Sequence, residues 1–429
     1  MSGLSFQNGM MPSLKLPTIQ NWSCQNCSRC CRQHLIEITP EERKRILDQN
    51  WTPADGVPAD RPLIVEFGPP WNRRYRLGHQ ADGACVFLDE RGLCRIHARF
   101  GEAAKPLPCR LYPYAFHPSG KAVAVSLRFS CPAAVRNHGR PVAEQTEELR
   151  SLAAEVVPPN INRLPAPRIS PRERLDWRDF LRFVDALDRT LADSASITVK
   201  LLRALFWIRL VEAARFDKVR GERLEEFLQL VTRAAQTQVT ADTLPTDQPT
   251  GTGRTQFRML VAQYARKDTP VDVEAGWRGR WRLFRAALRF ARGKGDVPPL
   301  QDIFVPVPFE SVEQPFGGLP EKADEIFTRY FRVKVQAIHF CGPAYYDLPL
   351  VEGFYSLVLI YPAILWLARW LAAGAGRTRL ETDDVVRAIT TADHYHAYSP
   401  AFGRGTFRRR VRILARLGDI EKLCVWYSR

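Results

Sequence analysis

The spacing of hydrophobic residues predicts two kinds of structure along this chain. Between residues 61 and 127 the apolar residues form short alternating runs, at 63–67, 74–77 and 121–127, which favour a few small strands. From residue 171 to residue 236 they recur at helical spacing, for example at Phe180, Phe183, Val184 and Leu187. The pattern therefore predicts strands in the N-terminal part and helices after it.

Two segments carry the signals of a helix start. Segments 39–42 (TPEE) and 170–173 (SPRE) each place Thr or Ser before Pro, with Glu three residues after the Thr or Ser. This is a capping box with Pro at the first helical position. We expect helices to begin near residues 40 and 171.

Two stretches lack helical or strand periodicity. Segment 136–169 carries Pro158, Pro159, Pro165 and Pro167, which predicts a linker. Segment 239–254 contains five threonines, two prolines and two glycines, which predicts a flexible loop.

Three later segments predict helices. One spans residues 321–340, and another begins near Asp383 with Thr382 as its cap. Between them, residues 354–368 are fifteen uncharged residues interrupted by Pro362. Because a membrane span needs about 18–20 apolar residues, we interpret this run as a buried helix.

A further helix is predicted from a row of arginines. Arg278, Arg282, Arg285, Arg289 and Arg292 recur at steps of four, three, four and three residues. The apolar residues 281, 284, 288 and 291 share this spacing on another face. The row is either a solvated face with an ordinary apolar back or a docking strip for an acidic protein or nucleic acid. No nucleic-acid-reading motif accompanies it, so we expect no sequence-specific nucleic-acid binding.

Composition narrows the class of protein. The 429 residues suggest two or three domains at about 150 residues each. An apolar fraction of 45% with 25% charged residues is typical of a soluble globular chain and excludes wholesale disorder, collagen and coiled coil. The net charge of +16 favours acidic partners. Residues 1–19 contain no sustained apolar run, so we expect a cytoplasmic protein without membrane insertion.

The cysteines are concentrated near the N-terminus. Of ten cysteines, Cys341 and Cys424 lie outside one 108-residue window. Four of the others occupy eight residues, where disulfides between neighbours would be strained, and a reducing compartment also disfavours disulfides. Convergent thiolates suit a thiophilic metal. We therefore predict eight metal ligands: Cys24, Cys27, Cys30, Cys31, Cys85, Cys94, Cys109 and Cys131.

The spacing leaves two metals open. Cys24, Cys27 and Cys30 reproduce the first three ligands of a ferredoxin-type run, and Cys131 followed by Pro132 matches its usual ending. This favours an iron–sulfur cluster with four irons. Zinc is the alternative, although the chain has one Cys-x2-Cys group instead of the two that structural zinc sites use. The Cys-x3-Cys-x2-Cys signature of radical S-adenosylmethionine enzymes is absent.

The segment after Cys85 predicts a hairpin. Residues 89–92 form a turn between two short apolar runs, which would place Cys85 and Cys94 opposite each other. Strand alternation would then put His97 on the same face as Cys94, as a ligand, a hydrogen-bond donor to sulfur or a structural residue. Arg95 and Arg110 either offset the negative charge of the thiolates or are ordinary surface arginines.

At this point the sequence resembles a known family. The run of cysteines at 24–31, with CVFL at 85–88, CRIH at 94–97 and CRLYP at 109–113, resembles the CxxCxxCC zinc- or iron-chelating domain over residues 20–135. Larger members with a helical C-terminal half are similar to flagellin lysine N-methylases, which transfer a methyl group from S-adenosylmethionine to surface lysines. Segment 381–396 resembles the His-bearing helix near the end of that family. The resemblance implies S-adenosylmethionine as a cofactor and a protein substrate such as flagellin.

No residue can be assigned as catalytic or as donor-binding from the sequence. His394 and His396 are two residues apart, so a helix would place them on different faces, which favours core packing or substrate contact over metal binding. The one glycine pair of note, Gly374 and Gly376, follows a helix, so a Rossmann-type methyltransferase is not indicated.

We therefore expect an α+β protein. A cysteine-cluster metal-binding domain with short strands spans residues 20–135, a linker 136–169, and a mainly helical domain 170–429. The function that we expect is a metal-cluster protein that methylates protein lysines. The alternatives are a non-catalytic metal-chelating module that binds a protein partner, and a protein for metal storage or transfer.

Overall fold

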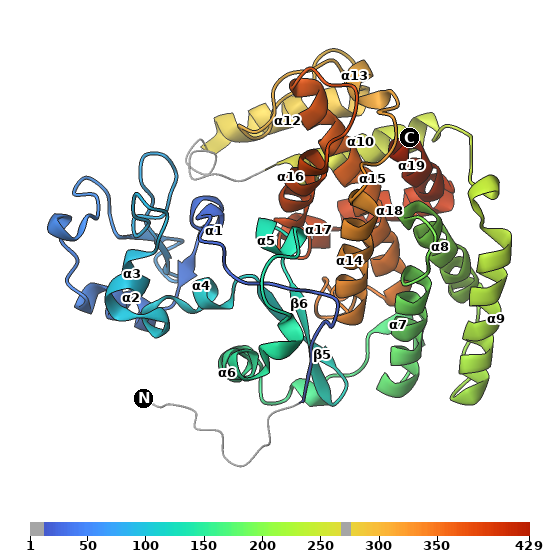
Figure 1. The fold of residues 1–429 in the computed structure, drawn as a ribbon, viewed down its shortest axis with the longest axis horizontal. Coiled ribbons are helices and arrows are strands. Elements are labelled where there is room, and N and C mark those ends of the chain that lie inside the picture. Colours follow the sequence, from blue (N-terminus) through green and yellow to red (C-terminus); the bar gives the residue numbers. More distant parts are fainter. Residues whose placement is uncertain (1–12, 267–275) are drawn as a thin grey trace. The chain divides into compact units, whose positions relative to one another are not determined.

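The computed structural model describes residues 13–266 and 276–429. The described chain forms two compact units. Unit 1 contains residues 13–22, 115–266 and 281–429, and unit 2 contains residues 23–114 and 276–280. Short strands lie in the N-terminal part and the remainder is mostly helical (Figure 1), which confirms the predicted α+β class.

Unit 2 contains a small antiparallel sheet in the strand order β2-β4-β3, flanked by short helices. The predicted helix start at residue 40 is confirmed, because Thr39 and Glu42 form a reciprocal capping box. Strands predicted at 63–67 and 74–77 are also confirmed. The elements of unit 2 are α1 (Arg29–Gln33), β2 (Glu37–Ile38), α2 (Pro40–Asp48), η1 (Pro53–Asp55), β3 (Ile64–Phe67), β4 (Arg74–Leu77), α3 (Arg95–Phe100), η2 (Glu102–Ala104) and α4 (Leu107–Leu111).

The N-terminal strands of unit 1 form a second sheet. Its order is β1 (Ser13–Lys15), β6 (Ala122–Leu127) and β5 (Tyr114–Ser119), with β1 parallel to β6. The predicted strand at 121–127 is thereby confirmed.

The segment expected to be an irregular linker contains a helix that covers this sheet. In α6 (Thr146–Val156), Leu149 and Ala153 are buried, and Ala153 packs in one cluster with Val123 of β6. The apolar stripe of α6 is narrow and partly made of alanine, so it gave little hydrophobic periodicity. The same segment holds η3 (Val142–Glu144) and η4 (Ile161–Arg163), and α5 (Pro132–Val135) precedes it.

The predicted helix start at residue 171 is wrong. Ser170 pairs with Glu173 in a two-stranded ladder of β7 (Arg168–Ser170) and β8 (Glu173–Arg174). The helix α7 (Trp177–Leu191) begins after Asp176, whose carboxylate accepts a hydrogen bond from the backbone N of Asp179 at 2.9 Å. Pro after Ser is compatible with a tight turn as well as with a helix start, and here the turn forms.

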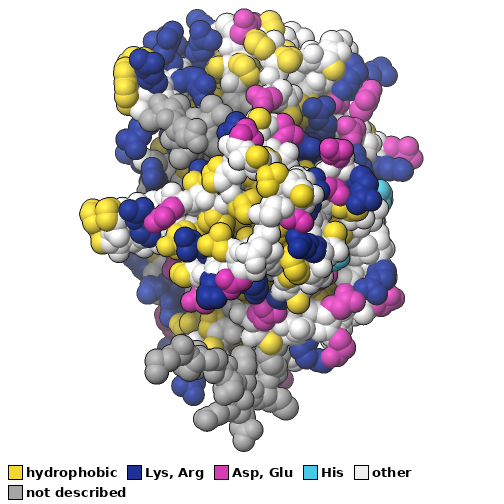
Figure 2. Space-filling model, turned by 90° about the vertical axis from the view of Figure 1, so that its left-hand side faces the viewer, with side chains coloured by type: hydrophobic (Ala, Val, Ile, Leu, Met, Phe, Trp, Pro, Cys, Tyr) yellow, Lys and Arg dark blue, Asp and Glu magenta, His cyan; other side chains and the backbone are white. Residues whose placement is uncertain are grey.

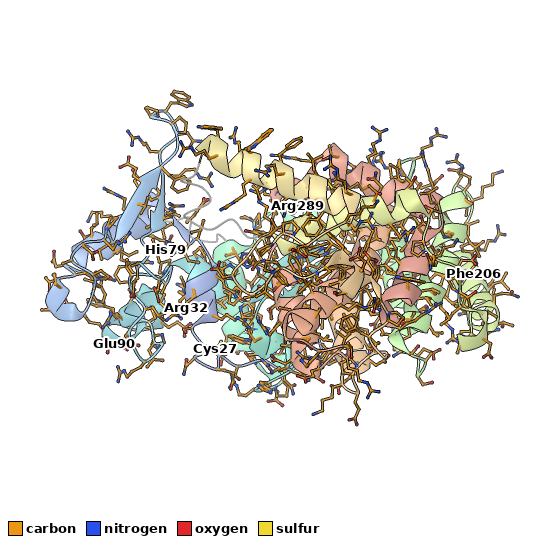
Figure 3. The ribbon with its side chains drawn as sticks, turned by 90° about the horizontal axis from the view of Figure 1, so that it is seen from above. Cys27, Arg32, His79, Glu90, Phe206 and Arg289 are labelled. Atoms are coloured by element: carbon orange, nitrogen blue, oxygen red, sulfur yellow. The ribbon has the colours of Figure 1, made fainter. Side chains whose placement is uncertain are left out.

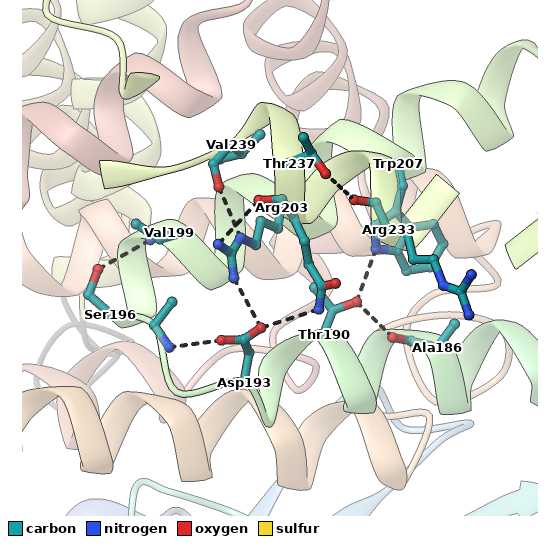
Figure 4. A network of polar contacts seen from close by, with 12 residues as sticks. Ala186, Thr190, Asp193, Ser196, Val199, Arg203, Trp207, Arg233, Thr237 and Val239 are labelled. Atoms are coloured by element: carbon teal, nitrogen blue, oxygen red, sulfur yellow. Dashed lines mark hydrogen bonds and ion pairs between the residues drawn. The ribbon is translucent and has the colours of Figure 1, made fainter. Parts of the chain in front are cut away.

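Helices α7, α8 (Ile197–Ala213) and α9 (Glu222–Gln238) pack against one another, with the predicted core residues of α7 buried. Figure 4 shows the polar contacts that join their ends. Arg203 donates to Asp193 Oδ2 at 3.0 Å and to the carbonyl oxygen of Val239 at 3.0 Å, and Trp207 Nε1 donates to Thr190 Oγ1 at 3.2 Å. These contacts satisfy half-buried polar groups at the turns between the helices.

The predicted loop at 239–254 is shorter than expected. After η5 (Ala241–Thr243), helix α10 (Gly251–Ala265) begins at the cap Thr250, whose Oγ1 accepts from the backbone N of Gly253 at 2.9 Å. A Cβ at Gly253 would lie 1.9 Å from Asp419 Oδ2, so a glycine is required by the close approach of Asp419. The glycines that suggested a loop therefore serve helix packing.

The core of unit 1 is built around α15 (Leu350–Gly374), which contacts α8, α10, α16 (Thr382–Asp393), α18 (Gly405–Arg416) and α19 (Asp419–Ser428). Residues 350–372 are all buried, and the helix continues through Pro362. By length and composition α15 could cross a membrane, but its apolar window lies wholly inside the protein, as predicted. The remaining helices are α13 (Phe309–Glu313), α14 (Ala323–Gln336) and α17 (Pro400–Gly403).

The arginine-rich helix forms as α12 (Gly276–Arg292), but its predicted apolar back is wrong. Trp281, Phe284 and Leu288 are 58%, 52% and 40% exposed. The helix is anchored instead by Ala286 and Phe290, which are buried. Two apolar stripes were available on this helix, and the one with Ala286 and Phe290 packs on the core.

Candidate metal centre

Five of the predicted cysteine ligands lie in the folded part of unit 2. Cys30 and Cys31 are on α1, and their sulfur atoms are 4.0 Å apart. The backbone N of Cys85 donates to the carbonyl oxygen of Cys31 at 2.8 Å, which ties Cys85 to α1. Cys94 is the residue before α3, and Cys109 is on α4. We call these five residues the thiol cluster.

The thiols of this cluster influence one another electrostatically. Burial, with Cys94 and Cys30 nearby, raises the pKa of the Cys85 thiol to about 12. Burial and three neighbouring cysteines, Cys85, Cys94 and Cys30, raise the pKa of Cys109 well above its usual value. The hydrogen bond with Cys31, followed by burial, raises the pKa of Cys30. These groups are therefore protonated thiols at neutral pH, and binding a metal as thiolates would release protons.

The donor set suits zinc or iron in its chemistry. Both metals bind thiolates, and the thiol cluster supplies five of them from helices and loops of one small unit. Within residues 13–266 and 276–429, however, no three His, Cys, Asp or Glu side chains meet at metal-ligand geometry. Coordination would require the cysteine side chains to rotate toward a common centre.

The other predicted ligands lie outside this cluster. Cys24 and Cys27 are exposed on residues 23–28, which precede α1 and form neither helix nor strand. Cys131 belongs to unit 1, where it is buried beside the start of α5 and accepts a hydrogen bond from Trp22 Nε1 at 3.4 Å. The assignment of all eight cysteines as ligands remains a prediction.

The expected hairpin between Cys85 and Cys94 is wrong in its pairing. The turn at 89–92 exists, with Asp89 Oδ1 accepting from the backbone N of Leu93 at 2.7 Å and Gly92 at a φ of +80°. Cys94, however, bridges to Leu88, and the chain then enters α3 at once. His97 is consequently exposed on a helix, and the strand alternation that placed it beside Cys94 does not apply.

A different histidine lies next to the cluster. His79 forms a backbone bridge with Cys85, and burial lowers the pKa of its imidazole. A neutral imidazole can bind a metal or donate a hydrogen bond to a thiolate. Figure 3 labels His79 and Cys27 in this unit. His79 lies two residues after β4 and belongs to no recognisable sequence motif, so the spacing of residues could not identify it as a site residue. Arg95, expected beside the ligands, donates to the carbonyl oxygen of Asp55 at 3.3 Å and thereby supports the neighbouring loop.

A comparison with known protein families gives a match that includes residues 23–114 of unit 2. Residues 23–132 match the CxxCxxCC family. The family is described as a "Putative zinc- or iron-chelating domain". The CxxCxxCC region contains the thiol cluster together with Cys24, Cys27 and Cys131. No curated protein and no solved structure gave a significant match to the chain.

Unit 1 holds a second concentration of functional groups, in its core. Lys334 Nζ and Asp393 Oδ1 form an ion pair at 2.9 Å, and both side chains are fully buried. The second oxygen of Asp393 accepts hydrogen bonds from the backbone N atoms of Phe129 and Ser130, just before Cys131. The carboxylate thus neutralises a buried ammonium and holds the segment that leads to Cys131.

Three histidines surround this pair. His339 Nδ1 lies 3.0 Å from Ser126 Oγ and 3.4 Å from Lys334 Nζ, and the His117 ring is 4.3 Å from the His339 ring. His396 Nδ1 lies 3.1 Å from Tyr264 OH. The Nε2 atoms of all three histidines are buried and have no hydrogen-bond partner among the described residues. A buried atom of this kind costs about 1–3 kcal/mol if it stays unpaired, so each of these Nε2 atoms favours a further hydrogen bond to water or to a ligand.

Burial keeps these histidines neutral. It lowers the pKa of His339 and of His396 well below the usual range, and the neighbouring Lys334 lowers both further. The His339 ring lies 5.8 Å from the ring of Tyr398, which is 38% exposed and lies 3.8 Å from the Arg128 guanidinium. We call Lys334, Asp393, His117, His339 and His396 the buried polar group. Its members come from three separate parts of the chain, at residues 117, 334–339 and 393–396, so no single local motif could predict it, and the sequence indicated only His396.

Proposed function

We propose that this protein chelates zinc or iron through cysteine thiolates of unit 2. The observation that carries the proposal is the thiol cluster, five cysteines gathered in a unit whose sequence matches a chelating-domain family. Cys24 and Cys27 can complete the ligand set, because their exposed segment is held by neither helix nor strand. Cys131 is proposed as a further ligand on the basis of its Cys-Pro sequence.

An iron–sulfur cluster is the form that we favour, because Cys24, Cys27 and Cys30 have the ferredoxin-type spacing. The test is the visible spectrum of the anaerobically purified protein together with its iron, zinc and sulfide content. A broad charge-transfer band with iron and sulfide supports the cluster. A colourless protein with stoichiometric zinc supports the zinc alternative, and a protein that retains neither metal contradicts the proposal.

The second candidate function is methylation of protein lysines with S-adenosylmethionine. The reaction moves the methyl group from the sulfonium to a neutral lysine amine and produces S-adenosylhomocysteine, an N-methyllysine and a proton. The amine must be uncharged before it attacks, so the site has to depress its pKa. The observation that favours this candidate is the buried polar group of unit 1.

The buried polar group would disfavour a second ammonium. The site is fully buried, which disfavours a charged amine; Asp393 already neutralises the Lys334 ammonium, and the nearby Arg128 adds a further positive charge. A substrate lysine amine buried beside this group would therefore lose its proton more readily than in water. The unpaired His339 and His396 Nε2 atoms are available to bind substrate or donor. A secreted or co-encoded protein, with flagellin as the first to test, is the proposed substrate.

Two measurements separate this candidate from a non-catalytic module. Isothermal titration of the metal-loaded protein with S-adenosylmethionine tests donor binding, and mass spectrometry of flagellin after incubation tests for added methyl groups. The expected result is donor binding and methylated lysines. Absence of both, with metal content verified, would leave a chelating module that binds a protein partner as the better account.

A further inference from the structure

Helix α12 turns an aromatic stripe toward solvent. Trp277, Trp281, Phe284 and Leu288 are 74%, 58%, 52% and 40% exposed. Steps of four, three and four residues place them along one line of the helix. The rings of Trp281 and Phe284 stack with centroids 5.5 Å apart. A contiguous exposed apolar stripe of this kind is typical of an interaction surface.

The stripe is not needed to hold the helix in place. Phe290, on the opposite side of α12, packs with its ring 5.7 Å from that of Phe309 and 5.9 Å from that of Trp366. Arg258 donates to the carbonyl oxygens of Phe290 and Ala291 at 3.0 Å and 3.2 Å, which satisfies groups at the C-terminal end of the helix. The anchored helix therefore presents the aromatic stripe on a rigid support.

Arginines accompany the stripe. Six arginines and no Asp or Glu occur between residues 276 and 292. Among the described residues, no carboxylate forms an ion pair with Arg285 or Arg289, and both are exposed. Figure 3 labels Arg289 on α12, and Figure 2 shows Lys and Arg side chains beside apolar ones in the upper part of the face that it presents. The positive charge here is available to an external partner.

The combination identifies the partner by its chemistry. An anionic partner would compensate the exposed charges of Arg285 and Arg289, and an apolar layer would cover the four exposed apolar side chains. A nucleic acid or an acidic protein surface supplies the charge, but Phe284 and Leu288 would find no apolar layer there. A bilayer with anionic headgroups supplies both, since aromatic and Leu side chains enter the headgroup boundary while guanidinium groups bind phosphates.

We propose that α12 binds the surface of a membrane that contains anionic phospholipids, with the helix lying in the plane of the headgroups. The proposal depends on neither the thiol cluster nor the buried polar group. It involves no membrane span, because the helix inserts only its outward side chains.

The test is co-sedimentation of the full-length protein with vesicles. We expect binding to vesicles of phosphatidylcholine mixed with phosphatidylglycerol, weak binding to phosphatidylcholine alone, and release as salt is raised. The variant W281S/F284S removes side chains that enter the headgroup boundary, and R285E/R289E removes charges that bind lipid phosphates, so each should bind at least about tenfold more weakly.

Matched controls are available on α9. Leu230 is 68% exposed there, and Arg223 and Arg233 are exposed, so R223E/R233E repeats the charge reversal elsewhere and L230S removes an exposed apolar side chain elsewhere. Both controls should bind vesicles as the unaltered protein does, with circular dichroism confirming that all variants are folded. No binding to anionic vesicles at low salt, or equal losses in the controls, would overturn the proposal. Binding to polyglutamate that needs the arginines but not the aromatic stripe, without vesicle binding, would assign α12 to an acidic protein instead.

Discussion

The two units differ in what their interiors are made of. The main hydrophobic cluster of unit 2 contains eight buried residues, of which one is Cys85, with Cys31 and Cys94 packed against them. Unit 1 surrounds α15, in which residues 350–372 are all buried. A small core with thiols at its centre provides little hydrophobic stabilisation, whereas a long buried apolar helix provides a large amount. We therefore expect unit 2 to depend on bound metal for its stability and unit 1 to be stable without it.

The largest expected effect is therefore the loss of metal. Stripping the protein with a strong chelator should unfold unit 2, because metal binding to thiolates contributes about 10–16 kcal/mol in small zinc domains. Limited proteolysis followed by mass spectrometry should show new cleavage within residues 23–114, while residues 281–429 stay protected. Equal protection of both parts after complete removal of metal would break the comparison.

A substitution in the core of unit 1 should lower stability without changing metal content. Trp366 is fully buried on α15, so Trp366→Ala should lower the free energy of unfolding of unit 1 by about 3–5 kcal/mol. Urea unfolding followed by far-ultraviolet circular dichroism measures this loss, since most helices lie in unit 1. Metal content should not change. The exposed Trp71, at 86%, offers the control Trp71→Ala, which should have little effect on stability.

An effect of intermediate size is expected for the pH dependence of the stability of unit 1. His339 and His396 are neutral in the folded state because their pKa values are lowered, whereas in the unfolded chain they titrate near the ordinary value of 6.5. Below that pH the unfolded state binds protons that the folded state does not. Stability is therefore complete above about pH 6.5 and falls at lower pH, by up to about 1.4 kcal/mol per pH unit for each histidine.

Urea unfolding at about pH 7.5 and about pH 5.5 measures this slope. His396→Gln should make it shallower, whereas His138→Gln, at an exposed histidine, should leave it unchanged. A slope that is identical in all three proteins would show that His396 is not buried in a neutral form.

The smallest effect concerns the helix cap of unit 2. Thr39 Oγ1 accepts from the backbone N of Glu42 at 3.2 Å, so Thr39→Ala should cost about 1 kcal/mol. In the metal-loaded protein this loss should be hidden by the stabilisation from the metal, and it should appear as a lower chelator concentration for half-unfolding. An unchanged chelator midpoint would mean that α2 forms independently of the rest of unit 2.

Local patterns predicted local structure well. Alternation placed β3, β4 and β6, and the TPEE segment placed the start of α2. The similar SPRE segment did not begin a helix, because a turn between two strands has the same residue preferences. The residues around it pair as β7 and β8 instead. The burial of α15 was predictable from its composition, since an apolar run of this length needs an environment without water.

Contacts between residues that are far apart in the sequence could not be predicted. The two apolar stripes of α12 look alike in spacing, and only the surrounding helices determine that Phe290 is buried and Trp281 exposed. The buried polar group joins Lys334, His339 and Asp393 from separate helices and turns, and each residue alone resembles an ordinary polar position. The thiol cluster was visible because cysteines are rare and close in sequence, but the bridge of His79 to Cys85 was not.

The central claim, that the thiol cluster holds the metal, is tested most directly by metal content. Zinc and iron are measured per protein in the variants Cys85→Ala and Cys109→Ala, beside Cys341→Ala and Cys424→Ala, which remove buried cysteines of unit 1. We predict that the first two lose most of their metal and that the last two retain the full amount. Full metal content in Cys85→Ala and Cys109→Ala, with the same visible spectrum as the unaltered protein, would contradict the account.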